Sequence, residues 1–439
     1  MTVTLILGRM LWADTAQPSQ VDWGVAVEGE RIVAVAANSD LRARFPQAAV
    51  VDATDCVITP AFVNAHHHMY GVLAHGIPLH AAPGGFWPFL EDFWWPRVED
   101  RMTHELIAAA TDWACLEMIR SGVTAFYDCL EGPYAIPGAL EVEAEVVRRR
   151  SLRGVLSFEA TERVSAENGE LGLRENARFI DSCRKRGGLV SGLMCFHTTF
   201  TCSADFIRQA FALAAEREAR VHMHLSEGTY EPQYCMSKFG MRPTAYYEEL
   251  GVLGPHVLAS QCVQVDPDEI DILARHGVHV AHQPLSNCEV GGGFSPVPEM
   301  LKAGMNVALG TDGYINNLFE VMRAAALVPK ARLLDPGVMP AASAWTMATQ
   351  NGARALGFSD LGTLAAGQQA DLLLIAADVP TPLAGHNLAD QLLLYRNPGD
   401  LRGVMCAGQW LSREGKVLGV DEETVRARVS EAANKLWRG

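Results

Sequence analysis

The chain has 439 residues, of which 49% are apolar and 20% charged, and its formal net charge is −15 at pH 7. The apolar content excludes a largely disordered chain, and the length favours one large domain with an appendage or two domains. The negative charge argues against nucleic acid or an anionic membrane surface as a partner, because both repel an acidic protein.

The termini and the cysteines indicate a compartment. No uncharged apolar run reaches membrane-spanning length, and the first residues carry no basic stretch and no cleavage site, so we predict neither a transmembrane helix nor a signal peptide. The ten cysteines form no C-x-x-C pair, which is typical of reduced, buried thiols. We therefore expect a cytoplasmic protein.

Both ends of the chain read as short strands. Near the N-terminus these are Val3–Leu7, Trp23–Val27 and Arg31–Ala36, with Gly29 in a tight turn before the third. Residues 370–376 and 401–410 have the same character. We expect the two ends, residues 1–57 and 358–439, to pair into one small β-sandwich domain.

The middle of the chain, residues 58–357, alternates apolar β-like runs with helical segments such as 105–119, 204–218 and 268–276. Eight such runs over about 300 residues favour a (β/α)8 barrel, an α/β fold. Alternation alone leaves a doubly wound open sheet as the competing interpretation. The runs are 57–63, 124–128, 154–159, 190–196, 220–225, 257–263, 278–282 and 307–310.

An aromatic segment, residues 84–96, interrupts the first strand-to-helix connection. Such loops crown the catalytic face of barrels, so the segment could be a lid or a pocket wall, with Trp87 as a substrate-binding candidate. A hydrophobic loop packed on the barrel rim is the alternative.

Three consecutive histidines stand at the end of the first barrel strand. Residues two apart on a strand point to the same side, so His66 and His68 face inward and His67 points away. Two buried imidazoles side by side need a partner, and a divalent metal ion supplies one.

Polar residues end three later strands. His222 and His224 repeat the spacing of two, and Glu227 follows three residues on; His282 ends the seventh run and Asp312 follows the eighth. Each is weak evidence alone. Together they are strong, because barrel enzymes draw catalytic residues from the carboxyl ends of several strands.

Four motifs, in this order along the chain, carry a family resemblance. Residues 60–68 resemble the signature P-G-F-[VI]-N-x-H-x-H, with Ala61 where glycine is usual. His224-Leu-Ser-Glu resembles H-x-x-E, and Gly310-Thr-Asp-Gly resembles G-T-D. Residues 361–372 are similar to a closing G-x-L-x-x-G-x-x-A-D-L stretch.

On these motifs the chain resembles the amidohydrolase superfamily. The branch is the aminohydrolase and chlorohydrolase group, which holds cytosine, guanine and adenosine-type deaminases and triazine hydrolases. Within it, residues 86–96, 155–180 and 310–314 are similar to the uncharacterised aminohydrolases associated with selenium metabolism.

The resemblance implies that His66, His68, His224 and Asp312 hold one divalent metal ion per chain. Three nitrogens and a carboxylate suit zinc, with iron(II) or manganese as alternatives. Binuclear relatives use a carboxylated lysine at the end of the fourth strand, and this chain has none there, so we expect a single ion. His197 matches a position that often contacts substrate; a polar residue lining the barrel is the other interpretation.

The same resemblance implies a mechanism. The metal makes hydroxide available near neutral pH. Asp312 accepts the water proton, and Glu227 hydrogen-bonds the substrate and passes it a proton, so that ammonia or an amine leaves.

Two positions depart from the family pattern. Gln261 stands where relatives carry a histidine, and glutamine cannot exchange a proton near pH 7. A neighbour such as His282 could substitute for it. His75 stands where relatives often carry arginine near the substrate, which could alter specificity.

These observations leave three hypotheses. The first is a metal-dependent aminohydrolase, or deaminase, of a small nitrogen heterocycle, acting on carbon–nitrogen bonds other than peptide bonds. The second is hydrolysis of a ring amide, a urea or a halogen substituent, which Gln261 favours. The third is a catalytically silent homologue. The expected partners are a small-molecule substrate and, by analogy, further copies of the chain, with neither nucleic acid nor membrane.

Overall fold

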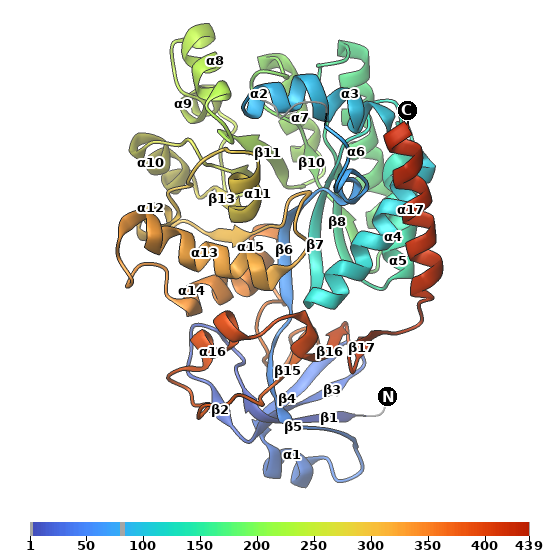
Figure 1. Cartoon of the computed structure of the whole chain (residues 1–439), viewed down its shortest axis with the longest axis vertical. Coiled ribbons are helices and arrows are strands. Elements are labelled where there is room, and N and C mark those ends of the chain that lie inside the picture. The colour runs from blue at the N-terminus through green and yellow to red at the C-terminus, as the bar shows by residue number, and fades with distance from the viewer. Residues whose placement is uncertain (1–2, 80–83, 439) are drawn as a thin grey trace. The chain divides into compact units, whose positions relative to one another are not determined.

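The computed structural model describes residues 3–79 and 84–438, which fall into two compact units (Figure 1). One unit comprises residues up to 64, 116–125 and 317–420; the other comprises 65–115, 126–316 and the residues from 421 onward. The domain boundaries expected from the sequence differ from these units and stay a prediction.

The first unit contains a nine-stranded sheet built from both ends of the chain. Its order is β18-β17-β16-β15-β5-β1-β3-β4, with β2 paired to β1. The strands are β1 (Thr4–Leu11), β2 (Gln20–Val21), β3 (Trp23–Glu28), β4 (Arg31–Ala37), β5 (Ala49–Pro60), β15 (Leu372–Ala376), β16 (Leu401–Cys406), β17 (Gln409–Arg413) and β18 (Lys416–Val417).

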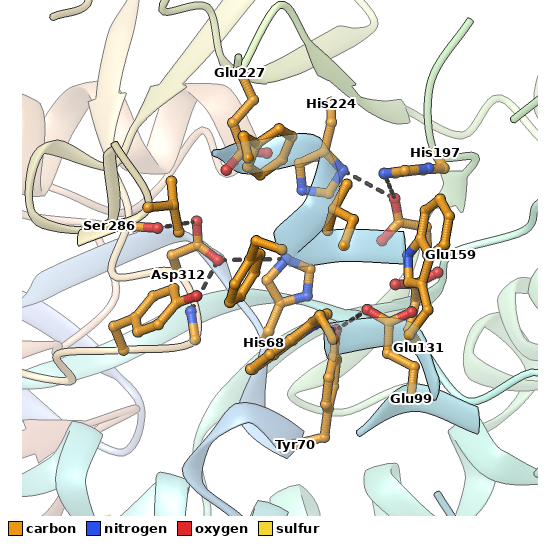
Figure 2. Close-up of a pocket in the computed structure, with 18 residues that line it drawn as sticks. His68, Tyr70, Glu99, Glu131, Glu159, His197, His224, Glu227, Ser286 and Asp312 are labelled. Carbon is orange, nitrogen blue, oxygen red and sulfur yellow. Dashed lines mark hydrogen bonds and ion pairs between the residues drawn. The ribbon is translucent and has the colours of Figure 1, made fainter. Parts of the chain in front are cut away.

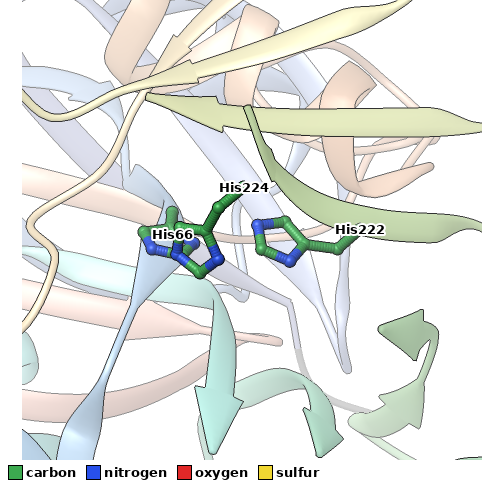
Figure 3. Close-up of side chains that lie close together, drawn as sticks. All are labelled: His66, His222 and His224. Atoms are coloured by element: carbon green, nitrogen blue, oxygen red, sulfur yellow. The ribbon is translucent and has the colours of Figure 1, made fainter. Parts of the chain in front are cut away.

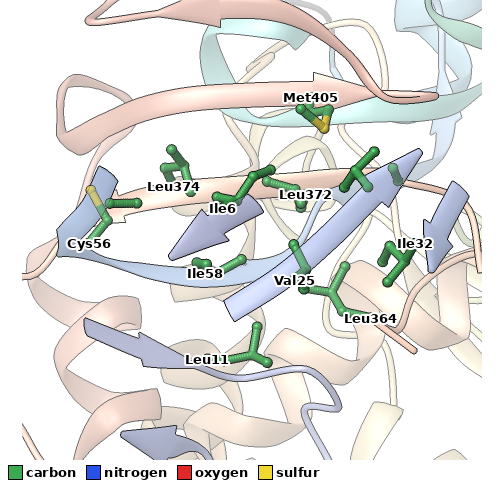
Figure 4. Close-up of a cluster of buried hydrophobic side chains, with 13 residues drawn as sticks. Ile6, Leu11, Val25, Ile32, Cys56, Ile58, Leu364, Leu372, Leu374 and Met405 are labelled. Carbon is green, nitrogen blue, oxygen red and sulfur yellow. The ribbon is translucent and has the colours of Figure 1, made fainter. Parts of the chain in front are cut away.

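These strands form one continuous hydrogen-bonded sheet, and whether its faces stack as a sandwich stays a prediction. The long strand β5 pairs in parallel with β1 and antiparallel with β15, and so joins the N-terminal and C-terminal strands edge to edge. Alternation along β1 places Ile6 in one hydrophobic cluster, drawn in Figure 4, and Leu5 and Leu7 in another. Both faces of the sheet therefore carry a core.

Two further sheets carry the strands of the middle of the chain. Their orders are β6-β7-β8-β9 and β10-β11-β12-β13-β14, and the second is parallel throughout. The strands are β6 (Phe62–His67), β7 (Val123–Leu130), β8 (Arg153–Phe158), β9 (Val190–Gly192), β10 (Met194–Cys195), β11 (Val221–Leu225), β12 (Val257–Gln261), β13 (His279–His282) and β14 (Val307–Leu309).

Helices separate these strands, so the mixed α/β class predicted from the sequence is confirmed. They are α4 (His104–Ser121), α5 (Ala139–Arg149), α6 (Ala166–Arg186), α7 (Ala204–Ala215), α8 (Tyr230–Phe239), α9 (Pro243–Glu249), α10 (Pro267–His276), α11 (Pro284–Glu289), α12 (Val297–Lys302) and α13 (Leu318–Leu333). Local sequence sets their ends. Asp266 and Glu269 form a capping box at the start of α10, and Gly277 ends the helix at a φ of 68°.

Shorter elements complete the chain. They are α1 (Asn38–Arg44), η1 (Met69–Ala74), α2 (Phe86–Pro88), η2 (Phe89–Trp94), α3 (Trp95–Arg97), η3 (Glu99–Arg101), α14 (Ala341–Thr346), η4 (Met347–Asn351), α15 (Gly352–Leu356), α16 (Leu388–Tyr395), η5 (Pro398–Asp400) and α17 (Glu422–Arg438).

The fourth predicted run, residues 190–196, is divided between the two sheets. β9 pairs with β8, and β10 pairs with β11. Two isolated parallel bridges also link the sheets, one between Ala160 and Phe196 and one between His67 and Asp312. The second bridge brings the end of β6 beside the end of β14, where candidate site residues stand.

The C-terminal helix α17 packs beside η1, the turn that follows His68. Trp437 donates a hydrogen bond from Nε1 to the carbonyl of Leu73 at 2.7 Å, and Arg101 donates to the carbonyl of Leu436 at 3.3 Å. The last turn of the chain thus helps to fix the segment after the histidines.

Across residues 3–79 and 84–438, no helix combines the length and the apolar character needed to cross a membrane.

Candidate active site

A cavity lies where several strands of the second unit end (Figure 2). Acidic and imidazole groups line it together with aromatic rings. The ionisable residues are His68, Glu99, Glu131, Glu159, His197, His224, Glu227 and Asp312, and the aromatic ones are Tyr70, Phe86, Phe89, Trp94, Trp95 and Tyr314. Such a mixture of apolar wall and convergent polar groups is typical of a small-molecule site.

Strained backbone marks the strand ends at this cavity. Ser226 follows β11, Gln261 and Cys262 end and follow β12, and Asp312 follows β14; their φ angles are 50°, 75°, 46° and 59°. L-residues seldom adopt these values, which cost of order 1–3 kcal/mol each and cluster at functional sites.

Four predicted ligand residues converge. Asp312 Oδ1 lies 3.5 Å from Nε2 of His68 and 4.0 Å from Nε2 of His66. The ring centroid of His224 lies 5.0 Å from that of His66 and 5.5 Å from that of His68. The donor set of three imidazoles and a carboxylate has the chemistry of a zinc site.

The outward nitrogens of two of these histidines are held by acceptors. His68 Nδ1 lies 2.6 Å from the carbonyl oxygen of Cys129, and His224 Nδ1 lies 3.0 Å from Glu159 Oε1. Both acceptors require an N–H at Nδ1, which leaves Nε2 to bind a cation. Although burial opposes it, the Glu159 carboxylate raises the pKa of His224 to about 10, and a divalent ion would replace the second proton.

Asp312 is fixed by three donors. Gln261 donates from Nε2 to Oδ2 at 2.6 Å, Ser286 donates from Oγ to the same oxygen at 2.8 Å, and the amide of Gly313 donates to Oδ1 at 2.9 Å. Oδ2 is thus occupied by two neutral donors, while Oδ1 faces the histidines. This arrangement orients one carboxylate oxygen toward the ligand group.

Glu227 lines the same cavity beside His224 (Figure 2). Burial and the neighbouring Asp312 carboxylate raise the pKa of Glu227 to about 8. The side chain therefore holds a proton near neutral pH, as a general acid requires.

A second acidic group lines another wall. Tyr70 donates to Glu99 Oε1 at 3.2 Å, and Arg163 donates to Glu99 Oε2 at 3.0 Å. Burial and the Glu99 carboxylate raise the pKa of Glu131 well above its ordinary value. Glu99 and Glu131 therefore place two carboxyl groups side by side on the lining of the cavity.

Of the three other predicted histidines, His197 lines the cavity, whereas His282 and His75 do not. His197 lines the cavity, with Nε2 3.7 Å from Glu159 Oε1. His282 is buried and is not among the lining residues; burial lowers its pKa to about 3, so it is neutral. His75 instead contacts the Gly313 carbonyl at 2.8 Å.

The aromatic segment forms one wall of the cavity through Phe86, Phe89, Trp94 and Trp95. Trp87 does not line it. Its ring stacks on Tyr230 with centroids 4.0 Å apart. The segment is thus a pocket wall, whereas Trp87 packs behind it against Trp95, and its role in substrate binding stays a prediction.

His67 is turned from the ligand group but buried. Its Nδ1 lies 2.7 Å from the backbone carbonyl of Asp312. It therefore supports the strained residue that follows β14.

Sequence reasoning missed Ser286, Glu159, Glu99 and Glu131. Glu159 closes a predicted strand and so carried a usable signal, the position of a carboxylate at a strand end. Ser286 lies on α11 and Glu131 just beyond β7, where no spacing marks them.

Comparison with known proteins gives consistent matches. Residues 57–411 match the Amidohydrolase family, and residues 24–48 match an imidazolonepropionase-like composite domain of bacteria. The chain is 35% identical to the 5'-deoxyadenosine deaminase of Methanothermobacter thermautotrophicus over 88% of this chain and 89% of that one. It is 33% identical to a 5-methylthioadenosine/S-adenosylhomocysteine deaminase of Syntrophobacter fumaroxidans over 98% of both chains.

Solved structures agree. An adenosine deaminase from Xanthomonas campestris with bound zinc has a TM-score of 0.89 at 27% identity, over 99% of both chains. The zinc complex of an atrazine chlorohydrolase from Arthrobacter aurescens has a TM-score of 0.83 at 21% identity, over 98% of this chain and 100% of that one, and supports the fold alone.

Proposed function

The chain belongs to the amidohydrolase family and is a metal-dependent hydrolase of carbon–nitrogen bonds other than peptide bonds, and from this premise we propose that it deaminates the adenine ring of a 5'-substituted adenine nucleoside. The observation that carries the proposal is the meeting of His68, His224, Glu227 and Asp312 in one cavity. The two named relatives supply the substrate class.

His66, His68, His224 and Asp312 are the proposed ligands of one zinc ion. Their donor set fits the ion, and the acceptors at Nδ1 of His68 and His224 aim Nε2 at it. When bound, the ion would lower the pKa of water and so supply the nucleophile.

Two carboxyl groups of the chain then handle protons. Asp312 accepts the water proton, and Glu227, protonated near neutral pH, donates to the ring nitrogen next to the reacting carbon. The proton on Asp312 then passes to the amino group, which departs as ammonia, and the remaining proton of the added water returns to Glu227. Tyr314, Trp94 and Phe89 provide apolar faces for the ring.

Glu99 and Glu131 stand on another wall of the cavity and offer acceptors for the sugar hydroxyls. The salt bridge from Arg163 to Glu99, at 3.0 Å, fixes one of these carboxylates. Their placement supports a nucleoside over a free base.

One observation favours a second candidate. Gln261 occupies the place of a proton-exchanging histidine, so a leaving group that departs without protonation, such as halide from a triazine, would also suit this site. The same metal and the same Asp312 would serve.

We also propose that the two sheets of the middle region close into one eight-stranded barrel. The bridges between Ala160 and Phe196 and between His67 and Asp312 support closure, and so do the solved relatives.

The test combines metal analysis with ammonia release. We expect about one zinc per chain in addition to any held elsewhere, and ammonia from 5'-deoxyadenosine or 5'-methylthioadenosine but not from adenine. Fully loaded protein that releases no ammonia, yet releases chloride from a chlorotriazine, would favour the second candidate. Protein that binds no metal at His66, His68 and His224 would be a silent homologue.

A further inference from the structure

A second group of donor atoms lies buried among the strands, next to the four proposed ligands. Cys129 comes from β7, Cys195 from β10 and His222 from β11, and all three are fully buried. The two Sγ atoms are 3.5 Å apart, and Cys195 Sγ is 3.2 Å from Nδ1 of His222. One donor atom from each residue lies within 4.8 Å of the other two.

The proposed deamination does not use this group. None of the three residues lines the cavity, and none belongs to the proposed zinc ligands. Figure 3 shows His222 beside His224 on the same strand, with His66 next to them; the ring centroids of His222 and His224 are 5.1 Å apart. The proposed function assigns these thiols no role.

We propose that Cys129, Cys195 and His222 bind a second zinc ion. Two thiolates and an imidazole are ligands that zinc prefers. Metal–sulfur bonds of about 2.3 Å and metal–nitrogen bonds of about 2.0 Å separate tetrahedral ligand atoms by roughly 3.5–3.8 Å. The Sγ–Sγ separation of 3.5 Å and the separation of 3.2 Å between Cys195 Sγ and His222 Nδ1 need to widen by only a few tenths of an ångström. Each thiol loses its proton as it binds.

Glu159 offers a fourth ligand and a link between the two centres. Its Oε2 lies 3.4 Å from Cys129 Sγ, while its Oε1 lies 3.0 Å from Nδ1 of His224. One carboxylate therefore touches both donor groups. An ion held by the thiols would attract Oε2 of Glu159 and so shift the carboxylate. Because Oε1 of the same carboxylate contacts His224, the shift would also change the position of that imidazole.

The remaining nitrogen of His222 is directed at Ser260. Its Nε2 makes a short hydrogen bond to Ser260 Oγ, which also lies 3.2 Å from Nδ1 of His66. A histidine held at Nε2 in this way presents Nδ1 to the sulfur atoms.

X-ray absorption spectroscopy at the zinc edge tests the proposal on the intact protein purified from zinc-supplemented cultures. The four proposed catalytic ligands are nitrogen and oxygen donors, so any sulfur shell near 2.3 Å reports the thiol group. We expect that shell, and we expect zinc to exceed one equivalent per chain.

Single substitutions show which cysteines supply the sulfur ligands. Cys129→Ser and Cys195→Ser should each remove the shell, whereas Cys288→Ser, which alters an exposed cysteine, should retain it. A nitrogen and oxygen shell alone in fully loaded, unsubstituted protein would overturn the proposal, and that measurement needs no variant to fold. A sulfur shell that disappears only with Cys288→Ser would overturn it too. Ammonia release is scored separately, so failure of the deaminase proposal is distinguishable from failure of this one.

Discussion

Gln261 donates a hydrogen bond from its side-chain amide to Oδ2 of Asp312 at 2.6 Å. Ser286 donates to the same oxygen at 2.8 Å. Neither donor titrates near neutral pH, so this carboxylate keeps its orientation and its partners across the physiological range. An amide that cannot exchange a proton near neutral pH thus holds the residue proposed as base.

Replacing Gln261 with leucine should lower kcat by roughly 10- to 100-fold, because a hydrogen bond to a buried carboxylate contributes about 1.5–3 kcal/mol. The KM should change little, since Gln261 contacts Asp312 and does not line the cavity. Steady-state kinetics on the deamination substrate give both values. Gln264→Leu is the matched control, because it removes an amide bonded to the Gly292 carbonyl instead. A raised KM with unchanged kcat would place Gln261 against the substrate.

Asp312→Asn should reduce turnover by at least roughly 1,000-fold while the protein still folds, because the amide can neither accept the water proton nor supply an anionic ligand. The comparison pairs an ammonia assay with circular dichroism and thermal unfolding. Substantial activity in a folded variant would rule out Asp312 as the base.

His67→Ala should lower the free energy of unfolding by about 1–3 kcal/mol without changing the metal content. The variant leaves the buried Asp312 carbonyl without the donor that now lies 2.7 Å away. Urea unfolding and elemental analysis of the same preparations measure the two effects. Loss of the metal together with the stability would mean that His67 belongs to the ligand group.

Glu143→Gln should stabilise the protein at alkaline pH. Burial and the neighbouring Asp128 carboxylate raise the pKa of Glu143 well above its ordinary value, and burial raises that of Asp128 to about 6. Carboxyls with raised pKa bind protons more tightly in the folded state, so stability falls as pH rises from about 4 through these folded values.

The amide of Glu143→Gln carries no charge, so the substitution should raise the free energy of unfolding at pH 8 and flatten its pH dependence. Glu141→Gln makes the same change at a more exposed position of α5 and should have little effect. Urea unfolding between pH 5 and 8 measures both variants. If the free energy of unfolding depended on pH equally in the wild type and in Glu143→Gln, the pKa of Glu143 would not be raised by folding.

The convergence of His68, His224, Glu227 and Asp312 could be predicted because each stands at or just beyond a strand end, where period-two spacing fixes the direction of a side chain. The helix α10 could also be predicted, because the residues that cap it are adjacent to it in the sequence. Both predictions rest on signals from residues close together in the sequence.

Other features depend on contacts between distant segments. Ser286 reaches Asp312 only because α11 folds back over the end of β14. The division of residues 190–195 into two strands follows from pairing with two different sheets. The stacking of Trp87 on Tyr230 could not be predicted from the sequence. Aromatic character indicates that a ring is buried, but it does not indicate which neighbour the ring contacts.

The contact of Trp437 with the Leu73 carbonyl has a practical consequence for anyone who produces this protein. The hydrogen bond ties the final turn of α17 to the segment that begins one residue after His68. An affinity tag or a fluorescent fusion attached directly after residue 439 would strain that turn and weaken its hydrogen bond to the Leu73 carbonyl. A tag at the opposite end of the chain, or a long flexible spacer before the tag, avoids this strain. Activity and stability measured on such a protein are then those of the enzyme itself.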